Sequence, residues 1–228
     1  MQARLSDFLW ALIFVSSACK TNPVLREESD VSSQGMITYS VVYPDSLAYG
    51  LRSAILPKEI VLVFKDGKAA FIASAGMGMI QMVNLLDYNK KSAVSLLVDN
   101  LRENVGCRQS PDEIRENENS FDYLFVDKTE TKKIAGYDCR RVVVKDAANG
   151  LQFDVYSCDR IRFPYWNSPF ASRDRLLLEY THTIHNLTMK LMATKVDLIT
   201  PVDTTLFEVK GNYKWMNQKD FISYLSVF

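Results

Sequence analysis

The feature that most constrains this chain of 228 residues is an Asp-Gly pair between two strand-like runs. Residues 59–65 read EIVLVFK, residues 68–74 read KAAFIAS, and Asp66-Gly67 separates them. A type I′ turn needs positive φ at both central residues, which Asp and Gly tolerate better than most residues. The pattern therefore predicts an antiparallel β-hairpin.

Similar runs of β-branched and aromatic residues follow at short intervals along the rest of the chain. Two short helices are expected, at 110–116 with Ser110 at the cap position, and at 218–225. Parallel strands need long crossovers, so short spacing implies antiparallel neighbours. The prediction is a mainly β fold, an antiparallel curved sheet or open barrel with a few covering helices. The remaining strands are expected at 35–43, 79–88, 93–98, 121–126, 132–134, 137–144, 151–157, 176–183, 187–199 and 206–209.

The first 18 residues have the layout of a signal peptide. Arg4 precedes an uncharged apolar run at 8–15, and the small residues Ser16, Ser17 and Ala18 follow it. The run is too short to span a hydrocarbon core of about 30 Å as a helix. Residues 1–18 are therefore expected to be removed during export.

Cys19 comes directly after this segment, and residues 15–19 (VSSAC) resemble the lipobox of bacterial lipoproteins. In those proteins the cysteine thiol is lipidated and the chain is cut before it, so the resemblance implies a membrane anchor on Cys19. Residues 19–34 are polar and lack apolar periodicity, as a flexible tether does. The expected location is the cell envelope, at the outer membrane facing the periplasm. An ordinary signal peptidase could instead cut at Ser16-x-Ala18 and release a soluble secreted protein.

Charge and motif content argue against several function classes. Lys and Arg total 27, as do Asp and Glu, so no net field favours nucleic acid. No G-x-S-x-G, H-E-x-x-H or paired C-x-x-C motif occurs. His182 and His185 would point to opposite faces of a strand. We therefore expect no catalytic residues, no metal and no cofactor.

Three cysteines lie within the expected domain, residues 35–228. If the loop after Val144 has four residues, Cys139 lies directly opposite Cys158, which allows a disulfide. Two buried thiols acting as small apolar side chains are the alternative. If Cys139 and Cys158 form a disulfide, Cys107 is left without a partner, unless Cys19 is not lipidated and pairs with it.

Several segments together resemble bacterial lipoproteins with the fold of lipoprotein carriers (LolA/LolB-like). A related group carries a Gly-Leu-Pro-Gly-Leu-Ile motif, where this chain has RFPYWNSPF at 162–170. The resemblance implies an unclosed antiparallel barrel whose concave face is covered by helices or loops. Relatives of this shape bind acyl chains or other amphiphiles. The similar segments are GMITYSV at 35–41, LP at 56–57, IVLVFKDG at 60–67, KKIAGYDC at 132–139, LEY at 178–180, MKLMA at 189–193 and VDTTLFEV at 202–209.

The aromatic, proline-containing loop around residues 163–170 is the best candidate for a pocket rim, through Phe163, Tyr165, Trp166 and Phe170. The expected function is non-catalytic binding of a hydrophobic or amphipathic ligand, or of an envelope partner. The alternatives are a structural or assembly lipoprotein with a filled core and, less favoured, a secreted hydrolase. An apolar cavity would distinguish the binding protein from the assembly protein.

Overall fold

The computed structural model describes residues 32–44, 56–119, 122–147, 150–164, 168, 170, 173–184 and 187–225. These residues belong to one compact unit, Val31–Phe228. The expected signal peptide, Cys19, Tyr165, Trp166 and His185 lie outside them. Among the described residues, no helix combines the length and apolar character needed to cross a bilayer.

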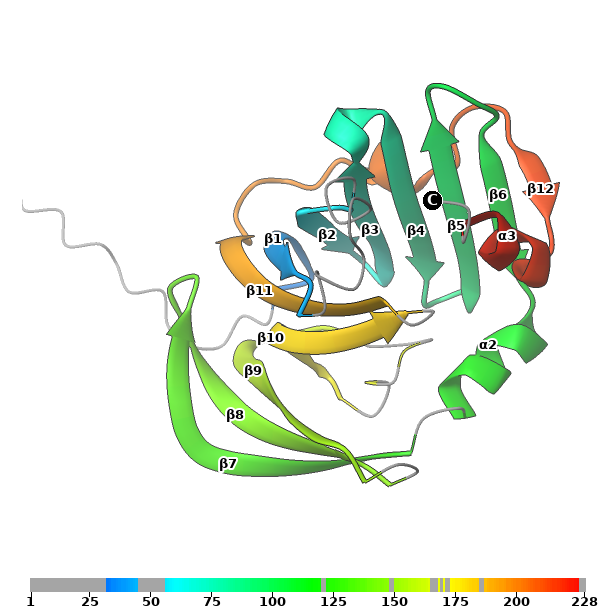
Figure 1. The fold of residues 1–228 in the computed structure, drawn as a ribbon. Coiled ribbons are helices and arrows are strands. Elements are labelled where there is room, and N and C mark those ends of the chain that lie inside the picture. The colour runs from blue at the N-terminus through cyan, green and yellow to red at the C-terminus, as the bar shows by residue number, and fades with distance from the viewer. Residues whose placement is uncertain are drawn as a thin grey trace, which may run out of the picture. The chain divides into compact units, whose positions relative to one another are not determined.

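The described chain forms a single sheet of twelve strands (Figure 1). The strands are β1 (Gln34–Val42), β2 (Glu59–Lys65), β3 (Lys68–Ala75), β4 (Ile80–Asp87), β5 (Ser92–Asp99), β6 (Val105–Gln109), β7 (Tyr123–Ile134), β8 (Tyr137–Asp146), β9 (Gln152–Arg162), β10 (Arg175–Ile184), β11 (Leu187–Asp197) and β12 (Lys214–Met216). Two 3₁₀ turns, η2 (Gly76–Gly78) and η3 (Thr204–Phe207), and two helices, α2 (Pro111–Asn119) and α3 (Gln218–Leu225), connect or cover them.

The strand order is β12-β6-β5-β4-β3-β2-β1-β11-β10-β9-β8-β7. Two runs of sequential hairpins, β1 to β6 and β7 to β11, are joined where β1 pairs with β11. Every pairing is antiparallel except that of β12 with β6. β12 and β7 are the two edges of the described sheet, so it is not closed into a barrel. The predicted mainly β, open and antiparallel sheet is confirmed.

The half of the sheet that contains β7 to β11 is strongly curved. Figure 1 shows β7, β8 and β9 as long bent strands. β7 contacts β11 although β8, β9 and β10 lie between them in the sheet. Shifts of register produce part of this curvature, one between Asp127 and Thr131 in β7 and others between β9 and β10.

The Asp66-Gly67 hairpin is present as predicted. Asp66 has φ of 48° and Gly67 has φ of 77°, the two positive values that a type I′ turn requires. The positive φ favours glycine at this position, and a Cβ on Gly67 would also lie 2.8 Å from the amide nitrogen of Asn89, which would have to move. The turn is therefore held close to the next hairpin, between β4 and β5.

Both predicted helices form, and the N-terminal end of α2 is capped as its residues suggest. The Glu113 N–H donates to the Ser110 hydroxyl (3.2 Å), while the Ser110 N–H donates to the Glu113 carboxylate (2.6 Å). This reciprocal pair is a capping box for α2. In α3, Phe221 is buried against Cys107 and the neighbouring core of β5 and β6.

The prediction of a closing strand at 206–209 is wrong. Residues 204–207 form η3, because the Asp203 carboxylate accepts a hydrogen bond from the Thr205 N–H (2.9 Å) and starts a helical turn. β12 occupies the edge instead, parallel to β6, and neither strand was predicted. The strands expected at 121–126 and 132–134 are parts of the single bent strand β7.

The largest core cluster joins the curved half of the sheet to β1 and β2. Edge-to-face aromatic contacts run through it, for example between Tyr39 and Tyr180 (centroids 5.8 Å apart) and between Tyr180 and Phe170 (5.6 Å). The Tyr39 hydroxyl is satisfied inside the core, since it donates to the carbonyl of Leu177 (2.9 Å).

Candidate functional site

A cleft of about 260 Å³ opens at the turn between β2 and β3. It is bordered by residues 32–33, by the turn at 64–68, by Tyr88 and by residues 162–164 at the end of β9. We call it the turn cleft. Its volume lies just below the usual range of about 300–1,000 Å³ for small-molecule sites, so only a single chain or a compact ring would fit.

The apolar part of the turn cleft is aromatic. Phe163 meets Phe64 (5.6 Å between centroids) and Tyr88 (6.0 Å) edge to face. Phe64 and Phe163 are 5% and 1% exposed, so the turn cleft reaches the edge of the main core. Burial raises the pKa of the Tyr88 hydroxyl, which keeps this side chain neutral.

The rim of the turn cleft carries three cations and one carboxylate, Asp66. Lys65 and Lys68 are direct register partners across the turn, so two like charges lie opposite each other. Neither forms an ion pair with a described residue; the Lys65 ammonium donates to the carbonyl of Val202 (3.3 Å). Arg162 is held by Asp174 (2.9 Å). Opposed like charges destabilise a strand pair, and Asp87 on β4, the other register partner of Lys68, offsets part of this repulsion.

The predicted pocket rim is only partly brought to this site. Phe163 does line the turn cleft, but from its buried side. Phe170 is 2% exposed and lies in the main core against Tyr123 and Tyr180. Tyr165 and Trp166 lie outside the described residues, so their part in a rim stays a prediction.

The two cysteines predicted to face each other do so. Cys139 and Cys158 are direct partners in the β8–β9 register, and both are completely buried with free thiols. The loop between the strands has the four residues that the prediction required, since the Asp146 N–H bonds to the carbonyl of Leu151 (2.9 Å).

A buried carboxylate, Glu179 on β10, binds two lysines from neighbouring strands. Lys132 Nζ lies 2.5 Å and Lys190 Nζ 2.9 Å from its oxygens, and the Glu179 side chain is 7% exposed. Burial acts to raise the pKa of Glu179, but the hydrogen bonds from Lys132 and Lys190 outweigh it and the pKa is lowered. Such a triad tethers β7 to β10 and β11 across the curve of the sheet.

His182 is on β10, and burial lowers its pKa to about 4. The imidazole is therefore neutral at physiological pH. The described residues contain no group of three or more His, Cys, Asp or Glu side chains placed to bind a metal ion. The absence of a metal site and of catalytic residues in the whole chain stays a prediction.

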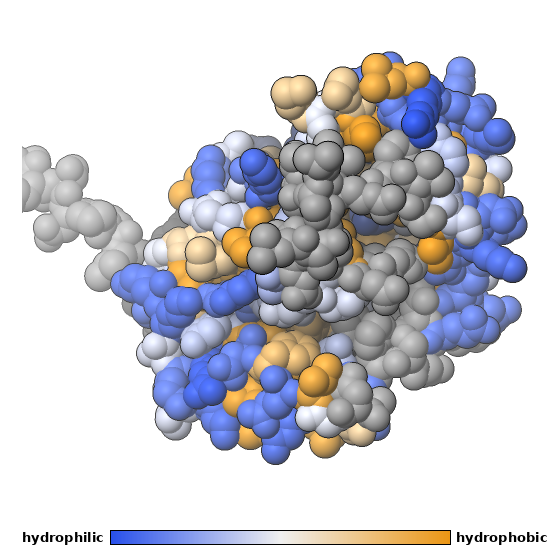
Figure 2. All heavy atoms as spheres, in the orientation of Figure 1, coloured by the Kyte–Doolittle hydropathy of each residue, from blue (hydrophilic) through white to orange (hydrophobic). Residues whose placement is uncertain are grey.

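Exposed apolar side chains gather at one end of the sheet. Met77 in η2 is 98% exposed and Leu101, after β5, is 72% exposed. The two connections are adjacent, since the Asn100 N–H donates to the carbonyl of Met79 (3.0 Å). Figure 2 shows hydrophobic and hydrophilic atoms side by side, both at the top of the view and at the bottom around β7 and β8.

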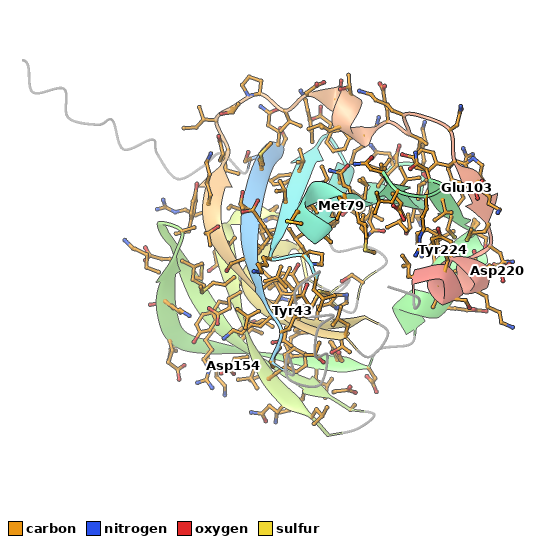
Figure 3. All side chains as sticks on the ribbon, turned by 45° about the horizontal axis from the view of Figure 1, so that its top comes forward. Tyr43, Met79, Glu103, Asp154, Asp220 and Tyr224 are labelled. Carbon is orange, nitrogen blue, oxygen red and sulfur yellow. The ribbon has the colours of Figure 1, made fainter. Side chains whose placement is uncertain are left out.

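Three acidic residues, Glu103, Asp154 and Asp220, lie apart from the turn cleft and from the exposed apolar residues. Figure 3 shows Glu103, Asp220 and Tyr224 together near β6, β12 and α3, whereas Asp154 lies on β9 at the other side of the sheet. Glu103 pairs with Lys214 (3.0 Å) and Asp154 with Arg141 (3.0 Å). Asp220 accepts a hydrogen bond from the Asn217 amide (2.8 Å), so each of the three carboxylates has a partner and none forms a new candidate site.

Sequence reasoning missed the cationic rim of the turn cleft. The two lysines stand directly beside Asp66-Gly67, so the predicted hairpin already placed them opposite each other. No comparable sequence signal brings Tyr88 or Phe163 to the same place.

Comparison with known proteins shows the fold alone. No family model and no curated protein matches the chain. Among solved structures, it is similar to PNGF-II in two crystal forms, with TM-scores of 0.51 and 0.50 at 18% identity. The matches cover 85% and 86% of this chain but 32% and 34% of PNGF-II, so the chain spans about a third of that protein.

Proposed function

We propose that this chain is a non-catalytic lipoprotein of the bacterial cell envelope, and that it binds an anionic amphiphile in the turn cleft. The observation that carries the binding proposal is the lining of the turn cleft, which joins the cationic residues Lys65, Lys68 and Arg162 to the aromatic residues Phe64, Tyr88 and Phe163. The ammonium groups suit an anionic head, and Phe64 and Phe163 suit an apolar chain or ring.

The size and order of the turn cleft support a small ligand. The β2–β3 turn is held by the Asn89 side chain, which donates to the carbonyl of Asp66 (3.1 Å), and by the Tyr88 N–H, which donates to that of Gly67 (2.8 Å). Because the turn is already ordered by these hydrogen bonds, ligand binding would cost little further loss of conformational entropy.

Dodecanoate is a suitable probe, since it joins one carboxylate to a single apolar chain. We expect calorimetry to detect binding that weakens at high salt, because exposed charge pairs are screened. In ¹⁵N-labelled protein, amide signals of residues 65–68 and 88 should shift. Dodecyl maltoside, with the same chain and no charge, should bind more weakly.

Lys68→Ala is the sharpest variant, because Lys68 is exposed and its removal leaves the core intact. Loss of one rim cation should raise the Kd for dodecanoate roughly fivefold, equivalent to about 1 kcal/mol. Lys145→Ala on β8 is the matched control and should leave the Kd unchanged. Absence of dodecanoate binding, or equal loss in both variants, would refute binding in the turn cleft.

The second candidate is a structural or assembly lipoprotein whose core is filled. The burial of Phe163 and Phe170 among aromatic rings favours it, since these side chains occupy the interior. If dodecanoate shifts no amide signal near the turn cleft, this candidate takes precedence.

The anchor is tested separately, by the mass of the processed N-terminus from the native host. A mature chain that begins at an acylated Cys19, and a Cys19→Ala variant that is not acylated, would support a lipoprotein. An unmodified N-terminus at Cys19 would make the protein a soluble secreted one, whatever the turn cleft binds.

A further inference from the structure

The β8–β9 hairpin places two sulfur atoms together in the interior. Seven successive residue pairs from Cys139↔Cys158 to Lys145↔Gln152 show no shift of register, so the two cysteines lie on the same face. Both have 0% exposure. Direct partners on antiparallel strands are close enough for a disulfide, with Cβ atoms about 4.5–5.5 Å apart before any adjustment.

The surroundings of Cys158 favour its thiolate. The Cys139 thiol is within hydrogen-bonding reach of the Cys158 sulfur and lowers the pKa of Cys158; burial opposes this, and the N–H groups of Arg160 and Ile161 support it. These two residues lie in a bulge, since β10 pairs with Cys158 and next with Arg162. Bulges turn backbone groups out of the ladder, which here directs two donors at one sulfur.

Cys139 is the complementary partner. Its pKa is raised, first by its hydrogen bond with Cys158 and then by burial. Its sulfur also lies 3.5 Å from the carbonyl oxygen of Tyr137. Cys158 is therefore the sulfur that loses its proton more readily and acts as the nucleophile, whereas Cys139 remains a thiol.

We propose that Cys139 and Cys158 form an intramolecular disulfide by exchange with a small or protein disulfide such as oxidised glutathione. The Cys158 thiolate attacks one donor sulfur, the donor S–S bond breaks, and a donor thiolate leaves. Cys139 then loses its proton to that thiolate and attacks the Cys158 sulfur, which releases the second half of the donor as a thiolate; this thiolate takes up from water the proton that Cys158 had given up. The two cysteines lose two electrons, and one donor disulfide becomes two thiols.

The place of the pair in the sheet explains how a donor reaches it. β7 and β8 are the last two strands at one edge. Before the core closes over this edge during folding, the sulfurs of the β8–β9 hairpin are exposed to a donor. The hairpin is local in sequence, so its register aligns the cysteines early.

Cys107 is an internal control for this inference. It lies on β6 and is buried with Leu97, Val105 and Phe221. Burial raises the pKa of its thiol, and Glu113 adds to the effect. Seven strands separate β6 from β9 in the sheet, so the folded chain keeps Cys107 away from the pair.

The test is refolding of the full-length chain from reducing denaturant in a mixture of oxidised and reduced glutathione. Free thiols are then alkylated and the digested chain is mapped by mass spectrometry. We expect a peptide linked between Cys139 and Cys158 in most molecules, with Cys107 alkylated. A folded chain with both thiols alkylated, or a link through Cys107, would overturn the proposal.

Two variants sharpen the result. Cys107→Ser should leave the linked peptide unchanged, whereas Cys158→Ser should abolish it and leave Cys139 alkylated. If Cys158→Ser does not fold, the wild-type map at several glutathione ratios still decides the question. The outcome is independent of ligand binding, because no probe for the turn cleft is present.

Discussion

The ring of Phe64 lies directly across Gly35, its register partner on β1, so that a Cβ on Gly35 would be 2.9 Å from the ring. The same Cβ would be 2.6 Å from a methyl group of Leu198. The glycine thus leaves room for the Phe64 ring beside β1, and the same residue borders the turn cleft. Core packing and the candidate site share this one contact.

Gly35→Ala is expected to lower the free energy of unfolding by about 1–3 kcal/mol, the usual cost of overpacking. Displacement of the Phe64 ring should also weaken dodecanoate binding. Urea unfolding followed by circular dichroism measures the first effect. Ser74→Ala, at an exposed position of β3, is the control and should change stability by less than about 0.5 kcal/mol. Equal stability of the two variants would contradict the close contact.

Glu179→Gln should destabilise the protein at pH 7 by about 1–2 kcal/mol, a value reduced because both lysines are about half exposed. The folded-state pKa of Glu179 is lowered from 4.5, so its contribution is complete above that value and is lost as pH falls through the folded pKa. Urea unfolding at pH 7 and pH 3 should show the difference from wild type shrinking. A constant difference would mean that packing, not charge, sets the effect.

His182 should make the fold sensitive to mild acid. Its folded-state pKa is about 4 and its ordinary value 6.5, so the unfolded chain binds the extra proton between these values. Stability should therefore fall as pH drops from about 6.5 to 4, by on the order of 1–3 kcal/mol. Comparison of wild type with His182→Gln by thermal unfolding isolates this contribution, since the variant lacks the titrating group. The same slope in both proteins would assign it to other residues.

The disulfide should stabilise the chain once formed. It closes a loop of roughly 20 residues, for which the chain-entropy model gives about 3 kcal/mol. Urea midpoints of oxidised and reduced wild-type protein should differ accordingly, and the Cys158→Ser variant should show no response to reductant. A stabilisation near zero would point to strain in the cross-linked hairpin.

Met77 has φ of 57° and almost complete exposure, so its conformation costs energy without burial in return. Met77→Asn should be neutral or should stabilise the protein by up to about 1 kcal/mol, because Asn tolerates this region better. Leu101→Asn, on the adjacent connection, is a matched exposed substitution with no expected gain. Clear destabilisation by Met77→Asn would show that the methionine packs in the folded state.

The local features of this fold could be predicted from sequence. The Asp66-Gly67 turn, the Ser110 cap of α2 and the opposition of Cys139 and Cys158 depend on residues close in the chain. Turn chemistry and strand alternation act over a few residues, so the patterns that encode them can be read without the rest of the protein.

The tertiary structure alone decided which distant segments meet. β1 pairs with β11, and β12 pairs with β6. Residues 204–207 form a helical turn instead of a closing strand, because the Asp203 cap competes there with strand pairing at the edge. The turn cleft likewise combines a hairpin turn with Tyr88 and Phe163, which share no sequence pattern. Such contacts are selected by the burial of apolar surface from the whole domain, a sum that no single segment contains.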